Sequence, residues 1–165
     1  MSDLLLTPTG PTQHAIAGRW WDVPSLPIIR LPDGSETLRV EDMEPIYKAV
    51  AVALCEEPTA LTPDALEFLC DLAGLRHIRL AEIAGVDRSA VTVWLRRNGP
   101  PLSRSLHLKR WFLLHLFPQF TAATTIPLSA LALDADILRW ISAAIRESIP
   151  LPRIRPTPAP LPAAA

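Results

Sequence analysis

Residues 75–97 read LRHIRLAEIAGVDRSAVTVWLRR, and this stretch decides how the fold of the chain is interpreted. The apolar positions of its first half recur at helical spacing, which predicts a short amphipathic helix that presents Ile78, Ala81, Ile83 and Ala84. Gly85 follows where the end of a helix favours a left-handed residue, with Val86 packed behind it. Asp87 is then placed to cap a second helix, because its carboxylate can accept backbone N–H groups two or three residues later.

The second helix is predicted to begin at Arg88. It would bury Val91, Trp94 and Leu95 and leave the opposite face polar and cationic, with Arg88, Ser89, Thr92 and Arg96 exposed. Two short helices joined by a tight turn, the second with a polar outer face, form the layout of a helix-turn-helix. The alternative is a helical hairpin in an unrelated all-α protein.

Basic residues gather around this stretch, although the whole chain has a net charge of −1. Between Arg76 and Arg110, eight arginine or lysine residues stand against two acidic ones, a balance of +6. Between Glu36 and Asp71, nine acidic residues stand against two basic ones, a balance of −7. A basic segment centred on a helix-turn-helix is typical of a surface that binds phosphates. A helical face solvated by arginine would give the same pattern.

The sequence indicates neither a metal, nor a cofactor, nor a catalytic centre. Cys55 and Cys70 lack the paired spacing of a zinc site and are too few for a disulfide scaffold. There is no glycine-rich phosphate loop and no nucleophile signature, so we expect no enzyme. The apolar run at residues 4–6 is too short for the core of a signal peptide, and no apolar run has the length of a membrane span. We therefore expect a cytoplasmic protein without a membrane partner.

The segments around the central stretch differ in composition. Adjacent Trp20 and Trp21 could stack on a base, but such a pair more often anchors a small sheet. The runs 26–31 and 36–40 flank an Asp-Gly turn and predict a β-hairpin. In the helix before the central stretch, Thr62 is the expected N-cap and Gly74 the stop. The expected domains are a flexible arm (1–18), a hairpin plus linking helix (19–58), the helix-turn-helix domain (59–118), a C-terminal helical extension (119–149) and a Pro-rich disordered tail (150–165).

Residues 61–117 resemble a helix-turn-helix domain of the Xre type, the class of phage repressors and Cro. The resemblance is carried by Leu75, the box LAEIAGV at 80–86, Arg88-Ser89, Val91 and Trp94. The order of hairpin, acidic linking helix and LTPD at 61–64 is similar to that of the MqsA/YgiT-type antitoxin regulators, although the zinc-binding cysteines of that group are absent. The resemblance implies a mainly α fold: a five-helix Xre-like domain with a small N-terminal β-hairpin and a C-terminal helix.

The resemblance also implies which side chains contact DNA. Base edges would be read from the second helix by Arg88, Ser89, Thr92 and Val93. Val93 stands where the family commonly has arginine or lysine, so an arginine-to-guanine contact is excluded there, and valine can only contact a thymine methyl group or pack on protein. The phosphate backbone would be held by His77, Arg79, Arg96, Arg97 and Arg104.

Two functions follow as hypotheses. The first is a transcriptional regulator, a repressor or antitoxin-like autoregulator, that binds double-stranded DNA as a homodimer on a palindromic site. Its dimer seam is predicted on the last helix, at Ile137, Trp140, Ile141 and Ile145, although this stripe could equally pack on its own domain. The second is a protein-interaction module, an antitoxin or adaptor that has lost base-specific readout and binds a protein partner such as a toxin.

Overall fold

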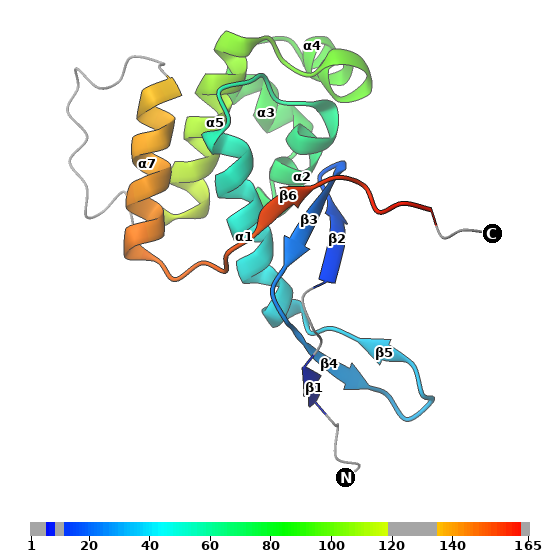
Figure 1. Ribbon diagram of the computed structural model, residues 1–165. Coiled ribbons are helices and arrows are strands. Elements are labelled where there is room, and N and C mark those ends of the chain that lie inside the picture. Colours follow the sequence, from blue (N-terminus) through cyan, green and yellow to red (C-terminus); the bar gives the residue numbers. More distant parts are fainter. Residues whose placement is uncertain (1–5, 9–11, 119–134, 163–165) are drawn as a thin grey trace. The chain divides into compact units, whose positions relative to one another are not determined.

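The computed structural model describes residues 6–8, 12–118 and 135–162 (Figure 1). The chain forms two compact units, one built from residues 1–50 and 151–165 and the other from residues 51–150. The first unit contains the β-strands, and the second contains most of the helical residues. The predicted mainly helical class with a small N-terminal antiparallel sheet is therefore confirmed.

The predicted hairpin is present as β4 (Pro27–Arg30) paired antiparallel with β5 (Glu36–Thr37). In its turn, Asp33 accepts hydrogen bonds from the backbone N–H and the hydroxyl of Ser35, and these bonds lower the pKa of the Asp33 carboxyl. Strand β1 (Leu6–Pro8) pairs with the other edge of β4. The prediction of a flexible arm over 1–18 is wrong here, because β1 is formed by pairing with a strand about twenty residues away and has no local periodicity.

A second three-stranded sheet is centred on β3 (Arg19–Val23), which pairs antiparallel with β2 (Thr12–Ile16) and β6 (Arg155–Thr157). Strand β6 corrects the prediction that the tail 150–165 is disordered. Its Pro156 is compatible with a ladder because β6 is an edge strand, which needs donors on one side only. Strand β6 is again formed by a non-local pairing, because its partner strand lies more than 130 residues earlier in the chain.

The tryptophan pair lies on β3. Trp21 is fully buried, and its Nε1 donates a hydrogen bond of 2.9 Å to the carbonyl oxygen of Ile16 on β2. Trp20 is only half-buried. The interpretation of the pair as a sheet anchor is thus confirmed for Trp21, whose ring belongs to the core of the first unit.

Six α-helices lie within the described residues, one more than the five predicted. Helix α7 contacts α5 inside the second unit, so it is part of the same bundle and not a separate extension (Figure 1). The caps of α2 are as predicted: Thr62 Oγ1 accepts from Ala65 N at 3.2 Å, and Gly74 ends the helix with φ 63°. The helices are α1 (Val40–Glu56), α2 (Pro63–Ala73), α3 (His77–Ala84), α4 (Arg88–Val93), α5 (Leu102–Leu116) and α7 (Ala135–Ser148).

Helix α5 ties the second unit together through two buried polar side chains. The hydroxyl of Ser105 accepts from Leu61 N and donates to the carbonyl oxygen of Pro100. Lys109 is 1% exposed, and its Nζ donates to the carbonyl oxygens of Glu57 and Thr59, both at 2.6 Å. Lys109 is one of the residues of the basic segment, but its side chain lies inside the protein and holds the connection between α1 and α2.

The predicted dimer seam on the last helix is wrong for two of its four residues. Ile141 and Ile145 are fully buried within the chain, together with Leu138, so they belong to the core beneath α7. Ile137 is half-buried and Trp140 is 49% exposed. The apolar stripe packs on its own unit because an amphipathic helix first covers the nearest apolar surface, here that of α5.

Candidate nucleic-acid interface

Helices α3 and α4 form the predicted pair of short helices joined by a tight turn (Figure 1). Gly85 ends α3 in the left-handed region, with φ 65°, and Val86 N donates back to the carbonyl oxygen of Ala81. This is the hydrogen-bond pattern that closes a helix before a change of direction. Asp87 occupies the N-cap position of α4, as predicted, but its side chain makes no capping hydrogen bond.

The buried side of the two helices differs in part from the prediction. Leu80, Ala81 and Ala84 are the buried residues of α3, whereas Ile78 is 53% exposed. On the following helix, Val91 and Trp94 are buried as predicted, and Leu95 is half-buried. Apolar spacing alone allows either neighbouring stripe of α3 to face inward. The position of the packing partners selects the stripe that contains Leu80.

The second helix is not a regular α-helix to its end. After Val93 it widens into a π-helical turn, η1 (Trp94–Asn98), closed by a 2.9 Å hydrogen bond from Gly99 N to the carbonyl oxygen of Trp94. Gly99 has φ 69°, and a Cβ atom at this position would lie 2.1 Å from the carbonyl oxygen of Leu61. The chain therefore leaves the helix at a point where the backbone touches the start of α2 and where only glycine fits.

Helix α5 fixes the end of α3. Arg104 Nη1 donates a 2.7 Å hydrogen bond to the carbonyl oxygen of Ala84, one of the carbonyls left without a helical partner at the C-terminus. The cation also lies at the negative end of the helix dipole. Arg104 was predicted to contact a phosphate, and in the structure it braces the helix-turn-helix.

All nine residues predicted to contact DNA have exposed side chains. Three of them already have partners within the chain: besides the contact of Arg104 with Ala84, Arg79 forms a surface ion pair of 2.5 Å with Glu82, and Thr92 Oγ1 donates to the carbonyl oxygen of Arg88 at 3.2 Å. Val93, the one apolar member, is 47% exposed. The nine are His77, Arg79, Arg88, Ser89, Thr92, Val93, Arg96, Arg97 and Arg104.

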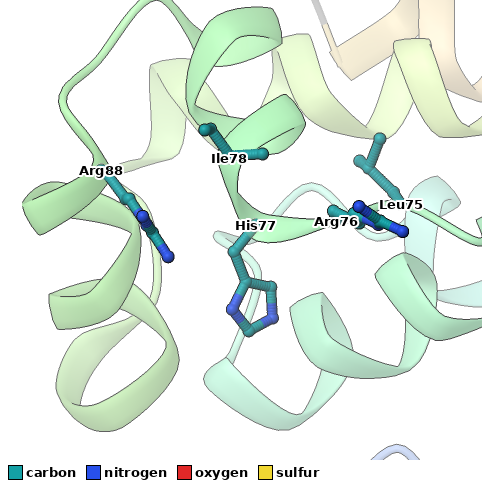
Figure 2. A pocket seen from close by; sticks show the side chains of 5 residues that line it. All are labelled: Leu75, Arg76, His77, Ile78 and Arg88. Carbon is teal, nitrogen blue, oxygen red and sulfur yellow. The ribbon is translucent and has the colours of Figure 1, made fainter.

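A shallow hollow lies where α3 and α4 begin. Arg76, His77 and Arg88 line it with nitrogen donors, and Leu75 and Ile78 supply apolar surface. Figure 2 shows the His77 ring between the side chains of Arg88, from α4, and Arg76, from the residue that precedes α3. The hollow brings together one predicted phosphate contact, one predicted base contact and Arg76, which the sequence analysis did not select.

The hollow is electropositive for two reasons. Arg76, His77 and Arg88 are exposed, and the cap residue of α3, Arg76, makes no side-chain capping hydrogen bond. The first N–H groups of the helix therefore lack a side-chain cap from this residue, and they lie at the positive end of the helix dipole. The position of Arg76 immediately before a predicted helix was the signal that could have identified it. Such an arrangement attracts an anion with several hydrogen-bond acceptors, such as a phosphate.

The positive charge of the segment is carried by fewer residues than the sequence count suggests. Lys109 is buried and Arg110 is half-buried. Within residues 76–110, the exposed cations belong to the helix-turn-helix and to the start of α5. These residues are Arg76, Arg79, Arg88, Arg96, Arg97 and Arg104.

Among the residues that the structure describes, no three His, Cys, Asp or Glu side chains meet in a way that could hold a metal ion. Over those same residues, no helix combines the length and apolar composition needed to cross a membrane. No protein-family model, no curated protein and no solved structure matches this chain.

Proposed function

We propose that this protein is a sequence-specific DNA-binding regulator that uses the α3–α4 pair as a helix-turn-helix. The observation that carries the proposal is the cationic hollow lined by Arg76, His77 and Arg88 at the beginnings of both helices. In a helix-turn-helix, the first helix crosses the phosphate backbone and the second presents its N-terminal residues to the major groove. A phosphate contact is therefore expected at the hollow.

The roles of the side chains follow from their positions. Arg76 and His77 would donate to a phosphate and set the orientation of the protein on the duplex. The residues that would face base edges lie on the exposed side of α4 and are Ser89, Thr92 and Val93. Arg88 lies between these residues and the pair that would donate to the phosphate. Arg96 and Arg97, on the π-helical turn, would hold the backbone farther along. Phosphate contacts add affinity for every sequence, whereas contacts from α4 add selectivity.

A homodimer on a palindromic site remains part of the proposal. Its interface would have to use residues other than Ile141 and Ile145, which are buried inside the chain. Two half-sites about one helical turn apart, ~34 Å, would indicate a two-fold symmetric pair of α4 helices.

The test is selection of duplexes from a random library at two salt concentrations, followed by affinity measurement on the recovered sequence. We expect one enriched motif and an affinity that falls steeply with salt. Arg76→Ala should weaken binding and lower the magnitude of the salt slope by about one, because one phosphate contact is lost. Arg30→Ala is the matched control, since Arg30 is an exposed arginine on β4 that pairs with Glu36.

Two outcomes would contradict the proposal. Retention of DNA without an enriched motif would leave only non-specific binding, and a protein partner would then be the better hypothesis. An unchanged salt slope in Arg76→Ala, with a motif still recovered, would show that the hollow does not contact the backbone.

A further inference from the structure

The exposed side of α4 carries aliphatic groups one turn after its start. Val93 is 47% exposed and has no hydrogen-bonding group. The neighbouring Thr92 is also exposed, but its hydroxyl is turned back to the carbonyl oxygen of Arg88, 3.2 Å away. The free tip of Thr92 is therefore its methyl group. The exposed Val93 side chain and the methyl group of its sequence neighbour Thr92 are here named the methyl patch.

Cations flank the methyl patch along the chain. Arg88 precedes it on α4, and Arg96 and Arg97 follow it on the π-helical turn, all three exposed. A ligand that satisfies both features must carry negative charges and, between them, a small apolar group. In the major groove, the one apolar group on the base edges is the 5-methyl group of thymine, and the phosphates run along both sides.

A protein partner fits the methyl patch less well. A stable protein interface buries about 800 Å² on each side, with large apolar anchors at its centre. Two β-branched side chains next to an arginine-rich turn supply only a small part of such an area. A single methyl group on an anionic polymer matches both the size of the patch and the charge beside it.

We propose that Val93, supported by the methyl group of Thr92, selects a thymine by contact with its 5-methyl group. This inference rests on the DNA-binding function proposed above and names the base that the patch recognises. It predicts a half-site with one thymine position where the methyl group itself, and not the pairing edge, is recognised.

The test replaces each thymine of the recovered site, one at a time, with deoxyuridine, which lacks only the 5-methyl group. Affinities are measured for the wild type, Val93→Ala and Leu102→Ala. Leu102 is the matched control, since it is an aliphatic residue of similar exposure, 48%, at the start of α5. The circular dichroism and thermal unfolding of each variant show that it is folded.

At one position in each half-site, the change to deoxyuridine should weaken wild-type binding about fourfold, the size expected for one methyl-sized group no longer buried. Val93→Ala should bind thymine and deoxyuridine duplexes about equally at that position. Leu102→Ala should discriminate as the wild type does. This coupling between one side chain and one methyl group would establish the contact.

Three results would overturn the inference. Specific binding that is insensitive to deoxyuridine at every position would remove the methyl contact while leaving the DNA-binding function intact. Equal discrimination by the wild type and Val93→Ala would place the contact on another residue. Failure to recover any enriched duplex would overturn the proposed function together with the inference.

Discussion

Lys109 shows how far the role of a single residue can depart from its sequence context. It stands in a run of basic residues, yet its ammonium group is buried and donates to the carbonyl oxygens of Glu57 and Thr59. The burial of a charge is costly unless its hydrogen bonds are satisfied, and these two bonds supply that compensation. The two carbonyls lie 52 and 50 residues earlier in the chain, so no local pattern reveals them.

The substitution Lys109→Met should lower the free energy of unfolding by about 2–4 kcal/mol, because the carbonyl groups of Glu57 and Thr59 both lose their donor. Urea unfolding followed by circular dichroism measures the change. Lys48→Met is the control: Lys48 forms a surface pair with Glu44, one helical turn away, and should cost about 0.5 kcal/mol or less. Equal losses in the two variants would contradict the structural role given to Lys109.

Among the helices, boundaries set by local chemistry were predictable and those set by distant contacts were not. Thr62, Gly74 and Gly85 act as the sequence predicts, because caps and left-handed stops depend on the residue itself and its nearest neighbours. The π-helical turn after Val93 was not predicted. Its end is governed by the close approach of Gly99 to Leu61, which is a tertiary contact.

The two N-caps offer a test at the level of the element. Thr62→Ala should destabilise the protein by about 1 kcal/mol, because the hydroxyl that accepts from Ala65 N is lost. Asp87→Ala should cost less, about 0.5 kcal/mol or below, because the Asp87 side chain makes no capping hydrogen bond and acts only through its charge. Urea unfolding of both variants gives the comparison. A larger loss for Asp87→Ala would show that its carboxylate caps α4 in solution.

The strands depend on partners even more than the helices do. The hairpin β4–β5 is predictable because its Asp-Gly turn is a local signal that depends only on adjacent residues. Strand β2 was missed, although the turn that joins it to β3 contains Ala17 and Gly18, both with positive φ. Alanine at such a position gives no recognisable turn signal. Strand β6 exists because the edge of β3 accepts it.

At the scale of the whole molecule, the helical core isolates both cysteines from water. Burial raises the pKa of the Cys55 and Cys70 thiols to about 12. The folded state therefore keeps these protons to a higher pH than the unfolded chain, in which the thiol pKa is about 8.5. Because the pKa of each thiol is raised in the folded state, the thiol contributes its full stabilisation below about pH 8. This contribution is lost as the pH rises towards 12.

Between pH 8 and pH 10, the unfolding free energy of the wild type should fall by about 2 kcal/mol more than that of Cys55→Ala. The reason is that the Cys55 thiol ionises in the unfolded chain over this range but stays protonated in the folded protein. Urea unfolding at the two pH values measures this difference, and Lys or Tyr titrations common to both proteins cancel. Parallel losses in the two proteins would show that Cys55 reaches water in the folded state.

By itself the sequence determined the mainly helical class, the β4–β5 hairpin, the caps of α2 and the pair of short helices around Gly85. These features depend on residues close together in the chain, whose spacing and backbone preferences are visible in the sequence. The tertiary structure alone decided which apolar stripe of α3 and α7 is buried, where Lys109 and Arg104 find their partners, and that β1 and β6 are strands. It also brought Arg76 into one hollow with His77 and Arg88. The physical reason is the same in each case: burial and hydrogen bonding are satisfied by partners distant in the sequence, and the fold selects among arrangements that local pattern permits equally.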